Sequence, residues 1–233
     1  MSTDQAAEEH LRAIRLLMER ATIYRAISAP TALFGGLLSV GLAAAMLWWQ
    51  AQDGTRNVDA RAYYQAWLFV LAATLAANTF FIWQGAHQRG EPLVSAGFRL
   101  AVRSVTPAFF AGIAISAVLT ITTRLALFPT LMWVTFYGLG LLATMSFAPR
   151  SIVALGWAFL FTGVLAFAYF VFVGIEPDFD LPTPTRFWPA ALMGATFGTY
   201  HLIYAACAWP RRALVLEATE RRPLVTESFP PVP

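Results

Sequence analysis

Two side chains that can both donate and accept hydrogen bonds, Asn78 and His201, stand inside long apolar stretches of the sequence. Counted from the outer ends of the helices predicted below, they lie about 15 and about 14 residues in, so both should be about 20 Å deep in a membrane. Polar groups at that depth are costly in lipid, and they commonly pair with each other or line a pocket. We therefore expect a hydrogen bond between Asn78 and His201, within a buried polar cluster that lines a small inward-facing pocket. Neighbours at similar depth complete the cluster: Thr79, Thr144 and Tyr200. The alternative is an ordinary packing contact that serves no ligand.

Catalytic residues are not indicated. Six spans with a histidine on the last one are typical of an intramembrane serine protease, but the fourth predicted helix has no Gly-x-Ser-Gly motif. No Asp or Glu lies inside a predicted span, which excludes a paired-carboxylate or carboxylate–metal site there. His87 and Glu91 have i,i+4 spacing, but two lone ligands on a loop are usually solvated. Cys207 is interpreted as a packing residue. The sequence predicts no catalytic residue, no metal site and no cofactor.

The composition assigns the chain to the membrane. Hydrophobic residues make up 58% of the 233 residues and charged residues only 12%. A soluble fold of this size could not bury so much apolar surface. The net charge is +3, and all 16 basic residues are arginine, with no basic face typical of nucleic-acid binding. We therefore expect the chain to lie in the lipid bilayer and not to bind nucleic acid.

The spacing of the charges predicts six membrane-spanning helices. Six long windows between successive charged residues contain no Asp, Glu, Lys or Arg. Each window is at least as long as the roughly 20 residues that an α-helix needs to cross the hydrocarbon core. The predicted fold is therefore an all-α, polytopic six-transmembrane-helix bundle. Residues 29–210 form this domain, with spans near 30–50, 63–86, 104–123, 127–147, 151–174 and 187–209.

The arginines predict the orientation. With the N-terminus inside, 12 arginines fall on inner segments and 4 on outer loops, a strong positive-inside bias. Both termini are therefore expected in the cytoplasm, with the chain in a bacterial inner membrane. Tryptophans favour the headgroup zone: Trp67 is among those assigned to the outer edge, and Trp133 lies deeper.

Residues 5–28 are predicted to form an amphipathic helix within a cytoplasmic segment, residues 1–28. Its apolar positions recur at three- and four-residue spacing, with charges on the other side. One interpretation is an interfacial helix on the inner leaflet; the other is a docking helix for a cytoplasmic protein or a second copy of the chain. The candidate contact residues are Leu11, Ile14, Met18, Glu19, Arg20 and Tyr24. The cytoplasmic tail, residues 211–233, ends in a Pro-rich segment and is predicted to be largely disordered.

Small residues predict close helix packing. Gly194 and Gly198 form a GxxxG motif in the last span, and Gly35, Ser39 and Ala43 repeat the spacing in the first. Without large side chains the backbones can approach closely. We expect packing within one chain, with a dimer face as the alternative.

Three stretches together resemble a family of uncharacterised bacterial six-span membrane proteins: LLMERATIYRAISAPTALFGG, PTLMWVTFYGLGLLATMSFAPRSIVALGWAF and GTYHLIYAA. The family has an N-terminal amphipathic Met-Glu-Arg-Ala-Thr helix that leads into the first span. The resemblance implies no activity. Met18, Glu19, Arg20, His201 and Tyr204 are family-like positions without an implied role.

The sequence thus favours a non-enzymatic, multi-pass inner-membrane protein acting as a partner-binding or sensory module. The alternative is a small-solute transporter or channel that uses the level of Asn78 and His201. A membrane enzyme is the third possibility.

Overall fold

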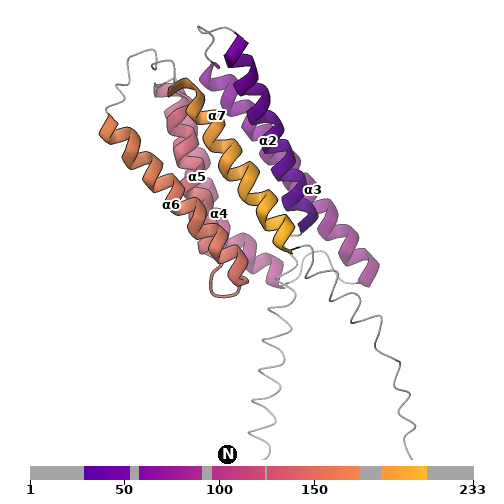
Figure 1. Ribbon diagram of the computed structural model, residues 1–233. Coiled ribbons are helices and arrows are strands. Elements are labelled where there is room, and N and C mark those ends of the chain that lie inside the picture. The colour runs from indigo at the N-terminus through magenta and orange to yellow at the C-terminus, as the bar shows by residue number, and fades with distance from the viewer. Residues whose placement is uncertain (1–28, 53–57, 91–95, 124, 174–184, 209–233) are drawn as a thin grey trace, which may run out of the picture.

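The computed structural model describes residues 29–52, 58–90, 96–123, 125–173 and 185–208, and this part of the chain is helical with no strand (Figure 1). The elements are α2 (Ala29–Gln52), α3 (Ala60–Arg89), α4 (Ala96–Thr123), α5 (Leu127–Leu142), α6 (Arg150–Val173), η2 (Thr185–Phe187), α7 (Trp188–Met193) and η3 (Gly194–Tyr200). Residues 201–208 continue the last helix. The predicted N-terminal helix, with Leu11, Ile14, Met18, Glu19, Arg20 and Tyr24, and the predicted tail lie outside the described residues.

Four of the described helices are long and apolar enough to cross a membrane: Ala29–Gln52, Ala60–Gln88, Phe98–Thr123 and Arg150–Phe172. The predicted all-α membrane architecture is to that extent supported. The other two predicted spans differ from uninterrupted α-helices. α5 has only 16 residues, because the chain turns from Ala143 to Phe147 before α6 begins at Arg150. In the last predicted span, near 187–209, α7 is followed directly by η3, a seven-residue π-helix.

Local sequence explains where α3 begins and ends. The Asp59 side chain accepts hydrogen bonds from the backbone N–H groups of Arg61 and Ala62, at 3.1 and 3.0 Å, as an N-cap does. Gly90 ends the helix with φ of 65°, a left-handed conformation that glycine adopts at little cost. The α-helix is therefore 30 residues long and starts at Ala60, ahead of the predicted span.

Successive helices run antiparallel, and α5 packs closely against both α4 and α6 (Figure 1). Glycines permit this approach: a Cβ added to Gly138 would lie 2.6 Å from the Leu160 backbone nitrogen on α6. On the other side of the bundle, α2 lies against α3 and against the helix that runs from α7 through η3. Because six antiparallel segments follow one another, the start of α2 and the end at residue 208 lie at the same end of the bundle.

The predicted small-residue positions make contacts within the chain. An added Cβ at Gly198 would lie 2.6 Å from Val40 Cγ2, and one at Gly194 would lie 2.8 Å from the Ala43 Cβ. At Gly35 the nearest atom would be Thr74 Cγ2, at 2.8 Å. The GxxxG motif is therefore a seam between the last helix and α2, as expected for packing within one chain.

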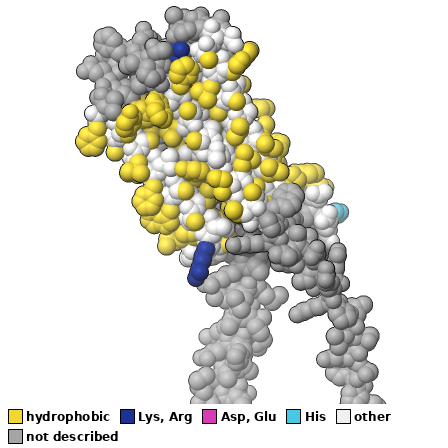
Figure 2. All heavy atoms as spheres, viewed as in Figure 1, with side chains coloured by type: hydrophobic (Ala, Val, Ile, Leu, Met, Phe, Trp, Pro, Cys, Tyr) yellow, Lys and Arg dark blue, Asp and Glu magenta, His cyan; other side chains and the backbone are white. Residues whose placement is uncertain are grey.

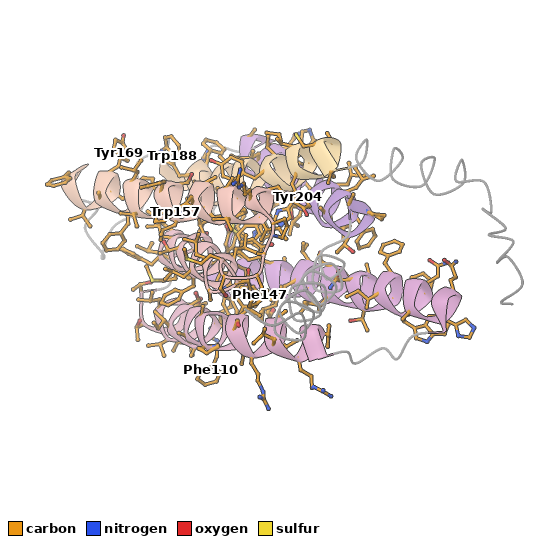
Figure 3. The ribbon with its side chains drawn as sticks, turned by 90° about the horizontal axis from the view of Figure 1, so that it is seen from below. Phe110, Phe147, Trp157, Tyr169, Trp188 and Tyr204 are labelled. Carbon is orange, nitrogen blue, oxygen red and sulfur yellow. The ribbon has the colours of Figure 1, made fainter. Side chains whose placement is uncertain are left out.

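Large apolar side chains cover the outside of the bundle as well as its core. Figure 2 shows hydrophobic side chains across the visible face, with arginine near its two ends. Phe110 on α4 is 73% exposed and Trp157 on α6 is 44% exposed, and both are labelled in Figure 3. A soluble protein rarely exposes an apolar surface of this extent, whereas a bilayer solvates it.

Candidate functional site: a cavity between five helices

The predicted Asn78–His201 hydrogen bond does not form in the described structure. Thr31 Oγ1 on α2 donates to Asn78 Oδ1 at 3.1 Å. His201 instead bonds Tyr137 on α5 and the Phe197 carbonyl. Asn78 and His201 therefore bond different partners, and the predicted hydrogen bond between them is wrong.

The predicted common depth is wrong, as the contacts with α2 show. Asn78 bonds Thr31, whereas Leu202, the residue after His201, lies against Gly36. Thr31 and Gly36 are five residues apart, which at about 1.5 Å per residue is about 7 Å along the helix.

The other members of the predicted cluster are also dispersed. Thr79 is exposed and bonds the Leu75 carbonyl of its own helix, at 2.9 Å. Thr144 is buried in the turn after α5 and bonds the Leu141 carbonyl at 2.6 Å. Tyr200 shares a hydrogen bond of 2.8 Å with Thr162 on α6. Only His201 lines the cavity described below.

His201 and Tyr137 form the polar centre of the bundle. Phe197 O, 2.9 Å from Nδ1, can only accept, so Nδ1 must carry a hydrogen. In the uncharged imidazole Nε2 is then the acceptor, and the Tyr137 hydroxyl, 2.7 Å away, donates to it. The imidazole has both nitrogens engaged, while the phenol oxygen keeps lone pairs with which it can accept a further hydrogen bond.

Aromatic rings enclose this pair. The Tyr137 ring lies 4.7 Å from the ring of Phe159, 4.8 Å from that of Phe197 and 5.7 Å from that of Phe109, centroid to centroid. The Phe109 ring is stacked on it, whereas the other two are tilted or edge-on. Tilted and edge-on contacts of this kind are favourable for aromatic quadrupoles, so the Tyr137 side chain is held in one position.

The π-helix places His201 and Phe197 toward the bundle centre. In η3 the hydrogen bonds of the helix span five residues instead of four, and the Thr199 hydroxyl likewise donates to the carbonyl of Gly194, five residues earlier, at 3.4 Å. Such a segment rotates the following side chains relative to a continuous α-helix, and π-helical turns often occur at functional sites. Gly194 and Gly198 allow α2 to pack beside it.

A cavity of about 110 Å³ adjoins the Tyr137–His201 pair. Its walls come from α2, α3, α4, α5 and the last helix, near the middle of the bundle. The lining residues are Gly35, Ser39, Trp67, Val70, Leu71, Thr74, Phe109, Gly112, Ile113, Trp133, Phe136, Tyr137, Met193, Phe197 and His201. None of these residues is Asp, Glu, Lys or Arg, so within the described chain the cavity presents an apolar, uncharged wall.

Two residues of the cavity lining have indole N–H groups that are buried away from the cavity and have no hydrogen-bond partner of good geometry within the described chain. They are Trp67 on α3, which is only 2% exposed, and Trp133 on α5. The Tyr63 hydroxyl, which is bonded to Thr130 at 2.7 Å, lies near the Trp67 indole. Buried N–H groups are rarely left unpaired.

Sequence reasoning missed most of this site. Trp67, assigned to the membrane surface, is buried in the core instead, because helix rotation turns it inward. Tyr137 was not singled out, although a phenol hydroxyl in the middle of an apolar span needs a partner. The need to satisfy this hydroxyl is the sequence signal that could have identified Tyr137.

The described residues contain no group of three or more His, Cys, Asp or Glu side chains that could hold a metal ion, and Cys207 is exposed. Comparisons with protein-family models, with curated proteins and with solved structures found no match.

Proposed function

We propose that this protein is a non-enzymatic integral membrane module that binds a small hydrophobic molecule in the cavity between its helices. The observation that carries the proposal is the cavity itself, because it is apolar, lies at mid-bundle and borders the Tyr137–His201 pair. Binding sites for small molecules are typically apolar clefts with a few placed polar groups.

In the proposed arrangement all six helical segments cross a bacterial inner membrane, with both termini in the cytoplasm. The antiparallel order of the described helices and the arginine distribution of the sequence support this topology. The N-terminal segment, residues 1–28, would carry the ligand-bound state to a cytoplasmic protein or to a second copy of the chain.

Ligand access from the bilayer is supported by the packing of α3 and α4. These helices contact each other sparsely compared with the close pairs α4–α5 and α5–α6. Ile113 on α4 both lines the cavity and is 39% exposed on the outside of the bundle. The Tyr64 hydroxyl donates to the Ile113 carbonyl at 3.1 Å, and the Tyr64 ring lies 5.1 Å from the Trp133 ring. Tyr64 thus links α3 to α4 beside Ile113.

The transporter alternative rested on a polar site formed by Asn78 and His201. Since each of these residues has another partner, that basis is gone. A hydrophobic ligand fits the uncharged wall better than a polar solute does.

A binding measurement in nanodiscs tests the proposal. Radiolabelled benzene should bind saturably to protein-containing nanodiscs, above its partitioning into empty ones. Val70→Phe should weaken this binding because it fills the cavity. Leu75→Phe, on the same helix but 52% exposed and outside the cavity, should bind as the unchanged protein does. Absence of a saturable component in the unchanged protein, or equal binding by both variants, would refute the proposed function.

A further inference from the structure

We infer that the ligand of this cavity is a small neutral molecule with one hydroxyl group on an apolar body no larger than a single ring. The inference rests on the proposed function and adds the chemical class of the ligand. Its basis is a pair of hydroxyl groups, those of Ser39 on α2 and Thr74 on α3, which line the cavity and make no hydrogen bond within the described chain.

The two hydroxyls differ from most serine and threonine side chains on these helices. Such a hydroxyl commonly donates to the backbone carbonyl four residues earlier, as Thr79 does to Leu75 at 2.9 Å. Ser39 and Thr74 make neither this bond nor another one among the described residues. Each therefore has a donor and lone pairs available for a ligand.

The burial of Ser39 determines which way its free hydroxyl faces. Ser39 is only 4% exposed and lines the cavity. Its oxygen is not among the unpartnered polar atoms that protein encloses completely, so it keeps some surface that a water-sized molecule can reach. Because nearly all of the residue is covered, this surface faces the cavity.

Thr74 belongs to the same part of the wall. A Cβ added to Gly35 would lie 2.8 Å from Thr74 Cγ2 and 3.1 Å from Thr74 Oγ1, so the threonine packs directly on this glycine. Gly35 and Ser39 are four residues apart on α2, which is about 6 Å along the helix. The two hydroxyls are thus about one helical turn apart, where α2 meets α3.

These groups set the polarity of the ligand. No lining residue is Asp, Glu, Lys or Arg, and an unpaired charge in such a place would be expensive, so the ligand is neutral. A ligand hydroxyl can accept from one protein hydroxyl and donate to the other, whereas a carbonyl oxygen can only accept. A single hydroxyl on the ligand therefore uses both Ser39 and Thr74.

The size and the remaining wall set the apolar part of the ligand. The cavity volume is about 110 Å³, which is smaller than an engineered cavity of about 150 Å³ that takes up benzene. One ring without further large substituents is therefore the upper limit. The rings of Phe109, Phe136 and Tyr137 line the cavity and favour an aromatic body. Phenol has this size and this single hydroxyl.

The test compares phenol with benzene, which has the same ring without the hydroxyl. Phenol displaces radiolabelled benzene from nanodiscs that contain the full chain, and both affinities are referred to the free ligand in water. Phenol should bind about fivefold or more tighter than benzene, since one net hydrogen bond contributes roughly twofold to tenfold. In a wall without available hydroxyls phenol would bind more weakly than benzene, because its own hydroxyl would lose its water partners.

Ser39→Ala and Thr74→Val each remove one hydroxyl with little change in shape. Either substitution should reduce the preference for phenol by about fivefold while benzene affinity stays nearly constant. The matched control is Thr79→Val, an exposed position on α3 outside the cavity lining, which should keep the full preference. Unchanged benzene binding shows that a variant remains folded, and if Ser39→Ala loses benzene as well, the Thr74→Val variant decides.

The two proposals fail in different ways. If neither benzene nor phenol binds saturably, the proposed function is wrong and the present inference falls with it. If benzene binds but phenol binds no tighter, or if both hydroxyl variants keep the full preference, the cavity takes apolar molecules and the hydroxyl assignment is overturned. A phenol preference that is lost with either hydroxyl, and kept in Thr79→Val, supports the assignment.

Discussion

Replacing Gly138 by alanine should weaken the packing of α5 against α6. The added Cβ would lie 2.6 Å from the Leu160 nitrogen, 2.8 Å from the Gly156 carbonyl oxygen and 3.0 Å from the Leu160 Cα. All three are backbone atoms of α6, so no side-chain rotation can make room. An ordinary contact begins at 3.4 Å, so the two helices must separate locally by about 0.8 Å.

Two opposing contributions determine how this substitution changes the free energy of unfolding: a packing cost and a gain in helix propensity. A radial gap of about 0.5–1 Å forfeits a quarter to a half of each van der Waals contact across an interface, and overpacking of a core generally costs about 1–3 kcal/mol. Alanine gains up to about 1 kcal/mol over glycine from its helix propensity. We expect a net loss of about 1 kcal/mol in the free energy of unfolding, since the overpacking cost exceeds the propensity gain.

Gly41→Ala is the matched control, because Gly41 lies on α2 with no atom within 4 Å of an added Cβ. It should keep or slightly raise the stability. Reversible unfolding in mixed micelles, followed by helicity, measures both variants. Equal stability of Gly138→Ala and Gly41→Ala would show that α5 and α6 are not in the contact described.

Two further substitutions test hydrogen bonds that join distant segments. Tyr137→Phe removes the donor to His201 Nε2 and should lower the free energy of unfolding by about 1 kcal/mol, a typical magnitude for a side-chain hydrogen bond between membrane helices. Gln50→Ala removes the buried amide that donates to the Arg186 carbonyl at 3.3 Å, and a loss of about 1 kcal/mol in the free energy of unfolding is expected. Both are read by the same unfolding measurement.

Matched controls on the same kinds of residue are available. Tyr169→Phe changes a tyrosine that is 53% exposed, and Gln52→Ala changes an exposed amide two residues after Gln50. Neither should alter stability by more than a few tenths of a kcal/mol, as is usual for exposed substitutions. If Tyr137→Phe behaves as Tyr169→Phe does, the Tyr137–His201 contact contributes nothing to stability.

Substitutions of residues that line the cavity should differ in their effect on stability. Trp67→Phe and Trp133→Phe remove donors that have no protein partner among the described residues, so they leave no acceptor unsatisfied. Tyr137→Phe, in contrast, leaves His201 Nε2 without its donor. The two tryptophan variants should therefore lose no hydrogen-bond free energy, whereas Tyr137→Phe should.

Local information was enough to predict the helical, membrane-compatible character of the chain. Apolar windows without a charged residue depend only on consecutive residues and on the energy of moving a charge into lipid. The same holds for packing at Gly194 and Gly198, where a missing side chain permits close approach whichever helix is opposite. The partner, α2, is a feature of the tertiary structure.

The site depends on the depth and rotation of each helix, which the sequence alone does not specify. The common depth predicted for Asn78 and His201 assumes that their helices begin level with each other, whereas their contacts with α2 separate them by about 7 Å along the bundle. The rotation of each helix, including the π-helical turn before His201, decides whether an aromatic residue faces lipid or the interior. Trp67 and Tyr137 therefore acquire their place beside the cavity only when five helices pack together, because rotation and depth are set by contacts between helices and not by residues within one.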